Sequence, residues 1–125
     1  MQSYESFLRD IKKYNLSISV ADARTGYRYC NGCGAKGGFH FPSTIWFVVV
    51  EAACNIHDIK WQKATSIDDL LKANEDFDND LKKICDSESQ NDITMFIRRM
   101  RIAKYVSGVE VVGTPAYAKE RGFTE

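Results

Sequence analysis

The residues best suited to chemistry lie in two short segments, YCNGCGAKGGFHFP at residues 29–42 and CNIHD at residues 54–58. The first segment has two cysteines at C-x-x-C spacing and four glycines within seven residues, followed by aromatic residues and a proline. The second segment places a cysteine three residues before a histidine, with an aspartate next to that histidine. Side chains of these types bind metal ions or transfer protons. The pair therefore predicts a zinc site, a structural link, or the two halves of a catalytic centre.

Zinc binding is one interpretation of the cysteines and the histidine. Cys30, Cys33, Cys54 and His57 form a Cys3His ligand set, with twenty residues between the two pairs. This spacing is typical of structural zinc sites and predicts a zinc-stabilised binding module without catalysis. A zinc site does not need the glycine pair at residues 37–38, however, so it leaves that feature of the loop unexplained.

Calcium binding is a second interpretation, and it uses the glycines together with Asp58. His57 and Asp58 are adjacent, and adjacent positions on a helix diverge by about 100°, so the two side chains would face two neighbouring centres. One carboxylate beside a loop rich in main-chain carbonyl groups suits a hard cation such as calcium, which takes oxygen ligands. Glycines allow such a loop to turn its carbonyl groups inward.

A long central helix is expected to carry His57 and Asp58. It should begin after an N-cap at Ser43 or Thr44 and continue to about Ala64, because this segment is long and its second half has a 3.6-residue apolar pattern. The β-branched run at residues 48–50 favours a strand, but the length and the downstream pattern outweigh that signal.

A second helix is expected from Ser66, which begins a variant of the capping box. Asn74 lies within the apolar stripe of this helix, whose members recur at helical spacing and are Leu70, Phe77, Leu81 and Ile84. A polar side chain in such a stripe is buried and needs a hydrogen-bond partner. If the two helices pack antiparallel, Asn74 is a natural partner for the ring of His57, and a base oriented by a further group is typical of assisted nucleophilic attack.

The remaining segments indicate a mainly α domain. Apolar spacing predicts a helix over residues 4–14 and a third helix beginning near Ile93. Residues 15–29 suggest short extended segments or a loop, and the tail after Gly113 is turn-like. At 125 residues the chain is expected to form a single domain, residues 1–125.

Composition excludes some classes of function. Lys and Arg number 17, as do Asp and Glu, so net charge gives no argument for a nucleic-acid partner. No apolar stretch is long enough for a transmembrane helix, and no signal peptide is visible at the start of the sequence. The compartment therefore stays open, and the four cysteines could be thiols, a disulfide or metal ligands.

The order of these motifs resembles the phospholipase A2 superfamily, especially its compact phage-encoded and viral forms. The motifs are CGAKGG at residues 33–38, ACNIHD at 53–58 and ANEDF at 73–77, and the later RRMRIAKY and VVGTPAY segments also resemble the phage-borne forms. The similarity covers roughly residues 27–117. It implies a mainly α, phospholipase A2-like fold, in which two antiparallel core helices pack beside a glycine-rich calcium loop.

The resemblance also implies a reaction, which is the calcium-dependent hydrolysis of the sn-2 ester of a glycerophospholipid at a membrane surface. His57 would be the general base that activates a water molecule, and Asp58 would bind calcium through its carboxylate. Main-chain carbonyl groups would complete the ligand set, from Gly32, Gly34 and one of Lys36 or Gly37. Cys33 and Cys54 match a family disulfide that ties the calcium loop to the helix. A virion or prophage setting, or secretion by a non-classical route, would follow.

Two departures from the family pattern bear on this expectation. The loop has one residue more than the usual Cys-Gly-x-Gly-Gly, so its third carbonyl ligand is either Lys36 or Gly37. Asn74 stands where the family has an aspartate that bonds to the catalytic histidine. A neutral amide orients the ring but supports an imidazolium less well. The expectation is therefore weakened activity, or an inactive lipid-binding domain of the same fold.

Several side chains keep two interpretations. The aromatic residues around the loop could be core or could enter a lipid interface, and they are Phe39, Phe41, Trp46 and Phe47. The basic cluster at residues 98–104 could be a solvated helix face or could bind anionic headgroups. Cys30 and Cys85 could pair, bind a metal, or do neither.

Overall fold

The structure is a computed structural model that describes residues 2–36 and 39–123. Within this part of the chain the fold is mainly helical, as predicted. The helices are α1 (Tyr4–Tyr14), α2 (Val20–Gly26), α3 (Glu51–Lys63), α4 (Ile67–Ser87), α5 (Asp92–Gly108) and α6 (Thr114–Arg121), with a 3-10 turn η1 (Tyr27–Tyr29) and a π-helical turn η2 (Val109–Gly113). The strands are β1 (Ala35–Lys36), β2 (Phe39–His40), β3 (Thr44–Ile45) and β4 (Val48–Val49).

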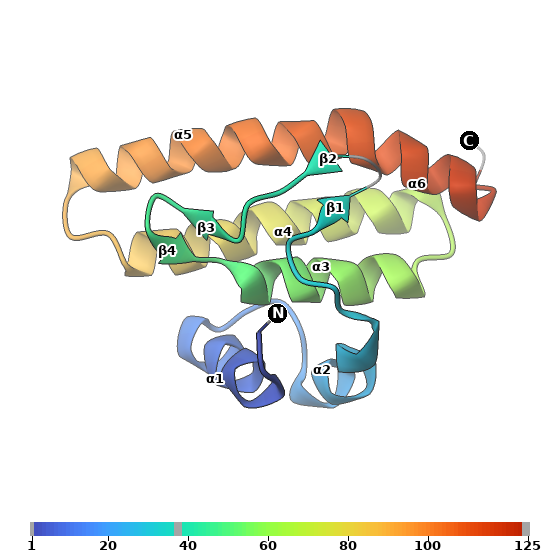
Figure 1. Ribbon diagram of the computed structural model, residues 1–125, viewed down its shortest axis with the longest axis horizontal. Helices are drawn as coiled ribbons and strands as arrows, with labels where there is room; N and C mark the ends of the chain where they lie inside the picture. The colour runs from blue at the N-terminus through green and yellow to red at the C-terminus, as the bar shows by residue number, and fades with distance from the viewer. Residues whose placement is uncertain (1, 37–38, 124–125) are drawn as a thin grey trace.

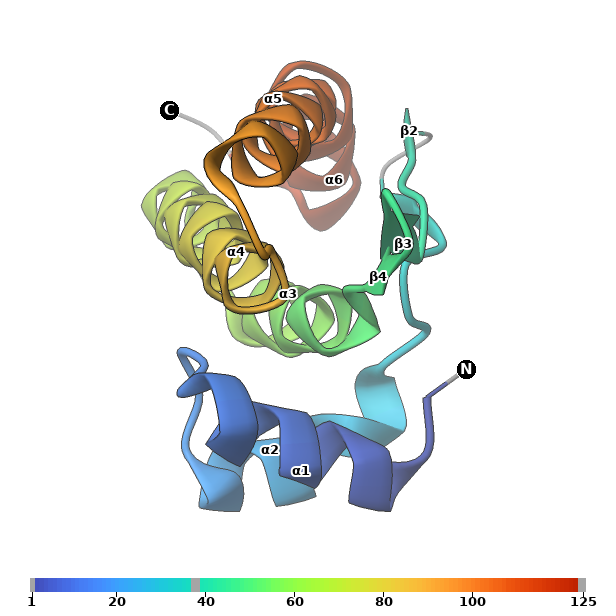
Figure 2. The same cartoon turned by 90° about the vertical axis from the view of Figure 1, so that its left-hand side faces the viewer.

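Helices α3 and α4 form the centre of the molecule and run antiparallel, because only a short connection joins them (Figure 1). Helix α5 lies along α4 and continues through η2 into α6, whereas α1 and α2 cover the other side of α3 (Figure 2). Side-chain caps fix where these helices begin: Ser66 accepts from the Asp69 N–H at 3.2 Å, and Asn91 accepts from the Thr94 N–H at 2.8 Å. Both predicted helices of the second half, α4 and α5, are confirmed.

The start of the central helix was predicted wrongly. Helix α3 begins at Glu51 rather than near Thr44, because residues 44–49 form a β-hairpin in which Thr44 pairs with Val49 and Ile45 with Val48. Trp46 and Phe47 make its two-residue turn at φ values of 41° and 72°. Such a turn matches the twist of two antiparallel strands, so the β-branched run behaves as its local preference dictates.

Two other segments also differ from prediction, and both are helical. Residues 20–26 form α2 after an N-cap at Ser19, although the glycine at its end indicated a turn. Gly26 is instead a packing position, because a Cβ there would lie 2.7 Å from Cγ2 of Ile59 on α3. The tail after Gly113 is α6, which carries Pro115 in its first turn, where a missing N–H costs nothing.

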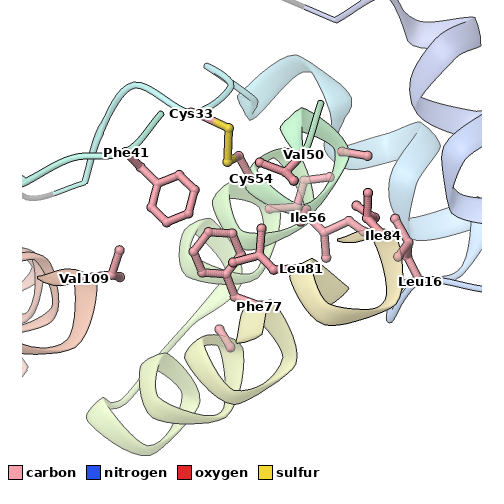
Figure 3. Close-up of a cluster of buried hydrophobic side chains, with 14 of the residues drawn as sticks. Leu16, Cys33, Phe41, Val50, Cys54, Ile56, Phe77, Leu81, Ile84 and Val109 are labelled. Atoms are coloured by element: carbon pink, nitrogen blue, oxygen red, sulfur yellow. A yellow bond between two sulfur atoms is a disulfide. The ribbon is translucent and has the colours of Figure 1, made fainter. Parts of the chain in front are cut away.

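The core lies between α3, α4 and the segment that leads into β3 (Figure 3). Phe41 packs against Phe77 with ring centroids 5.0 Å apart and against Tyr105 at 5.5 Å. The predicted stripe of α4 is fully buried, as Leu70, Phe77, Leu81 and Ile84. Among the aromatic residues around the loop, Phe41 is therefore core, whereas Phe47 is 89% exposed at the hairpin turn.

Candidate active site

His57 lies on α3 in an aromatic enclosure and is 1% exposed. Its ring stacks on Phe77 with centroids 4.5 Å apart and lies 4.4 Å from the Trp61 ring. Trp61 is one helical turn after His57 on α3, and Phe77 comes from the facing side of α4. These flat side chains restrict the rotation of the imidazole, so its two nitrogens keep fixed directions.

The hydrogen bond predicted between the two core helices is present. Nε2 of His57 lies 2.7 Å from Oδ1 of Asn74, and both side chains are buried. The antiparallel packing of α3 on α4 brings them together across a sequence separation of 17 residues. Asn74 is thus a polar member of an apolar stripe, and its amide is satisfied by this contact and by contacts with Trp61 and Thr114.

The indole of Trp61 determines which atom of the Asn74 amide faces His57. Trp61 Nε1 lies 3.2 Å from the same Oδ1, and an indole N–H can only donate. The amide must therefore present its oxygen here, and an oxygen can only accept from His57. The hydrogen-bond network thus assigns the proton of the neutral ring to Nε2 and the lone pair to Nδ1. A histidine held in this tautomer is a base at Nδ1.

The other end of the amide reaches a residue that the sequence did not indicate. Nδ2 of Asn74 donates to Oγ1 of Thr114 at 2.8 Å, and Thr114 is buried at the start of α6. Trp61 could have been found from its spacing of four residues after His57 on one helix. Thr114 could not, because 40 residues separate it from Asn74 and its segment was expected to be a turn.

A disulfide ties the glycine-rich loop to α3. It joins Cys33 to Cys54, as the family resemblance implied, and it is drawn in yellow in Figure 3. Cys30 and Cys85 are both buried, and burial raises the pKa of the Cys85 thiol to about 11. The Cys3His zinc set is not assembled, because two of its sulfur atoms are bonded to each other.

Asp58 faces the start of the loop rather than the core. Its Oδ2 accepts from the main-chain N–H of Asn31 at 3.0 Å, while His57 on the neighbouring position points toward α4. Gly32 follows with a φ of 73°, and a Cβ there would lie 2.7 Å from Oε1 of Glu51. Two carboxylates therefore flank the first peptides of the loop, and Glu51 is a neighbour that the sequence did not reveal.

The ligand set predicted for calcium lies only partly within the described residues. Within residues 2–36 and 39–123, no group of three His, Cys, Asp or Glu side chains could hold a metal ion. A cation bound by Asp58 would therefore need main-chain carbonyl groups as further ligands. Gly32 and Gly34 lie in the described part of the loop, and Gly34 has nothing closer than 3.7 Å to an added Cβ. Gly37, the third predicted ligand, lies outside the described residues.

The basic cluster of α5 divides into residues with different roles. Arg98 is buried and donates to the carbonyl oxygens of Glu88 at 3.0 Å and Trp46 at 3.1 Å, so it fastens the β3–β4 hairpin to the α4–α5 corner. Arg99 pairs with Asp86, whereas Arg101 and Lys104 are exposed. The same helix exposes apolar side chains, which are Ile93, Phe96 and Met100.

Comparison with known proteins gives no family assignment: no protein-family model matches the chain, and neither a curated protein nor a solved structure does. Among the described helices, each is too short or too polar to cross a lipid bilayer. A functional proposal for this chain therefore depends on the geometry of the site and on the motifs of the sequence.

Proposed function

We propose that the chain is a phospholipase A2-like carboxylic ester hydrolase that uses His57 as its general base. The observation that carries the proposal is the hydrogen bond from His57 Nε2 to Asn74 Oδ1, 2.7 Å long and oriented by Trp61. This bond leaves Nδ1 of His57 as the basic nitrogen. Asp58, the next residue on α3, lies against the glycine-rich loop, and the Cys33–Cys54 disulfide fixes that loop to the same helix. The base, the carboxylate and the clamped loop occur together in the sn-2 hydrolases that the sequence resembles.

In the proposed reaction, Nδ1 of His57 takes a proton from a water molecule while the water oxygen attacks the sn-2 ester carbonyl of a glycerophospholipid. The imidazolium formed keeps its Nε2–H bond to Asn74. The ester C–O bond then breaks, and the proton on Nδ1 passes to the departing alkoxide, which gives a lysophospholipid and a fatty acid. Calcium, when bound, supplies Lewis-acid stabilisation of the oxyanion. Asp58 and the main chain of Gly32, Gly34 and Gly37 would hold it.

A lipid-binding domain of the same fold with little turnover is the second candidate, and Asn74 is the observation that favours it. The imidazolium needs a counter-charge, and a buried amide supplies only a dipole. In serine proteases, replacing the aspartate that orients the catalytic histidine by asparagine costs about 10⁴ in turnover, because the asparagine selects the wrong histidine tautomer. Here Trp61 selects the tautomer with a basic Nδ1, so the expected loss of turnover comes only from the weaker stabilisation of the imidazolium charge.

An aggregated phospholipid surface is the proposed partner. Support comes from the outer side of α5, where Ile93, Phe96 and Met100 are exposed beside the cationic Arg101 and Lys104. Apolar side chains flanked by cations are typical of helices that lie in the headgroup region of an anionic membrane.

The test is calcium-dependent release of fatty acid from vesicles of an anionic and a zwitterionic phospholipid. Wild type should release fatty acid with calcium and not with a chelator, and His57→Gln should abolish release. His40→Gln is the matched control, because His40 is exposed on β2 and has no place in the proposed mechanism. No release by wild type, together with calcium-dependent vesicle binding, would favour the second candidate. Neither release nor binding would refute both.

A further inference from the structure

Thr114, at the junction of η2 and α6, lies behind Asn74 on the side away from His57. We infer that Thr114 is a positioning residue for the base: its hydroxyl holds the Asn74 amide in the one orientation that leaves Nδ1 of His57 basic. The catalytic consequence depends on the proposed function, but the effect on the histidine tautomer does not.

The direction of each hydrogen bond follows from the number of hydrogens available. Oγ1 of Thr114 lies 3.0 Å from the Val109 carbonyl oxygen, which can only accept, so the single hydroxyl hydrogen is used there. Toward Asn74, at 2.8 Å, the hydroxyl can therefore only accept. Asn74 must present its NH2 group to Thr114, and its oxygen consequently faces the opposite way, toward His57.

A rotated amide would reverse the histidine. If the NH2 group of Asn74 faced α3, it would meet the indole N–H of Trp61 and would force Nε2 of His57 to accept. The proton would then move to Nδ1, and the ring could not take a proton from water at that atom. Trp61 opposes this state with one bond of 3.2 Å, and Thr114 opposes it with a shorter bond at the other end of the amide. The imidazole itself can donate or accept at Nε2 and so gives no preference.

The π-helical turn η2 is what brings Thr114 to this place. The main-chain N–H of Thr114 bonds to the Val109 carbonyl, five residues back, and the Thr114 side chain bonds to the same carbonyl. Val109 and Thr114 are both buried, so water does not compete for these bonds. Single π-helical turns within helices are frequent at functional sites. Through this turn, the hydroxyl of Thr114, the amide of Asn74 and the imidazole of His57 form one hydrogen-bonded chain. Each group in it donates toward the Val109 carbonyl, so the donor of every bond is fixed.

The test compares Thr114→Val, which keeps the shape and removes the hydroxyl, with Thr114→Ser, which keeps the hydroxyl. Thr25→Val is the matched control, since Thr25 also donates to a main-chain carbonyl, at 3.3 Å, but is exposed on α2. Nitrogen-15 NMR of the histidine rings reads the tautomer without any substrate. The chain has two histidines, so a His40→Gln background leaves the signals of His57 alone.

In wild type, Thr114→Ser and Thr25→Val, the neutral ring of His57 should carry its proton on Nε2. In Thr114→Val a second population with the proton on Nδ1 should appear. On vesicles, Thr114→Val should lower kcat by about ten- to a hundredfold, with KM changed less than about twofold, because the reacting base is misplaced while lipid binding is not. Thr114→Ala replaces Thr114→Val if the latter does not fold.

An unchanged tautomer in folded Thr114→Val or Thr114→Ala overturns the inference, even if wild type hydrolyses lipid. A changed tautomer with no hydrolysis by any variant supports the positioning role and counts against the proposed function. Equal loss of kcat in Thr114→Ser and Thr114→Val would also overturn the inference, since the hydroxyl would then not be the group that matters.

Discussion

Replacement of Asn74 by aspartate is the most informative change at this site. The new carboxylate would take the position of an oxygen that lies 2.7 Å from Nε2 of His57. Between unit charges at that separation, the attraction to an imidazolium is about 6 kcal/mol at an effective dielectric constant of about 20. Burial of the carboxylate offsets several kcal/mol of this gain. Thr114 must also turn its one hydrogen from the Val109 carbonyl to the new carboxylate oxygen.

The net stabilisation of the imidazolium state is therefore about 1.4–2.7 kcal/mol, which raises kcat of Asn74→Asp about ten- to a hundredfold above wild type. The rate of fatty-acid release from vesicles, at saturating lipid and calcium, measures kcat of Asn74→Asp and of wild type. Asn79→Asp is the control, because Asn79 is exposed on the same helix and receives the same change in charge. A folded Asn74→Asp protein with kcat equal to or below wild type would refute the argument that charge on this residue limits turnover.

Three further changes test the loop and the core. Gly32→Ala should lower the free energy of unfolding by about 2 kcal/mol and weaken calcium binding, because φ of Gly32 is 73° and the new Cβ would lie 2.7 Å from a carboxylate oxygen of Glu51. Gly122→Ala is the control: its φ is 75° but no atom lies within 4 Å of the new Cβ, so the free energy of unfolding should fall by only about 1 kcal/mol. Replacing Cys33 and Cys54 by serine removes a disulfide between residues 21 apart in sequence, and it should lower the free energy of unfolding, measured in urea, by about 3 kcal/mol. A reducing agent should leave the free energy of unfolding of this variant unchanged. Burial raises the pKa of the Asp80 carboxyl above its ordinary value of 3.8. The stabilisation that this shift gives is therefore present below pH 3.8 and is lost as the pH rises through the raised pKa. Urea denaturation of Asp80→Asn across this pH range should lack that loss of stability, and a pH profile identical to that of wild type would contradict the prediction.

The central contact of the site could be predicted because it depends on local pattern and a short connection. The stripe of α4 has helical period, and a two-helix unit joined by a few residues packs antiparallel. A polar residue in that stripe therefore has to meet the facing helix. On these grounds the sequence predicts that Asn74 contacts His57, and the hydrogen bond between them is present. The Cys33–Cys54 disulfide could be predicted only from the family resemblance, because the spacing of the cysteines alone favours the zinc set.

The features that the sequence did not predict depend either on competing local preferences for helix and strand or on contacts between residues far apart in the chain. At residues 44–50, β-branched residues and a tight turn outweighed helical length, so α3 begins later than expected. Gly26 indicated a turn when considered alone, and only the neighbouring Ile59 explains why glycine is needed inside a helical segment. Thr114 reaches Asn74 through a non-standard turn, and no periodicity in the sequence marks such a turn.

The π-helical turn also determines how easily this site could be lost in evolution. A π-turn holds one residue more than the same turn of α-helix, so the loss of one residue between Val109 and Gly113 would convert it to α-helix and leave α6 facing as before. The loss of two residues would rotate α6 by about 100°, and the hydroxyl of Thr114 would leave Asn74. Such a deletion would alter neither His57 nor Asp58. A related chain could thus keep every residue of the C-x-x-H-D motif and still lose the support behind its base, so the length of this segment is as informative as the motif itself.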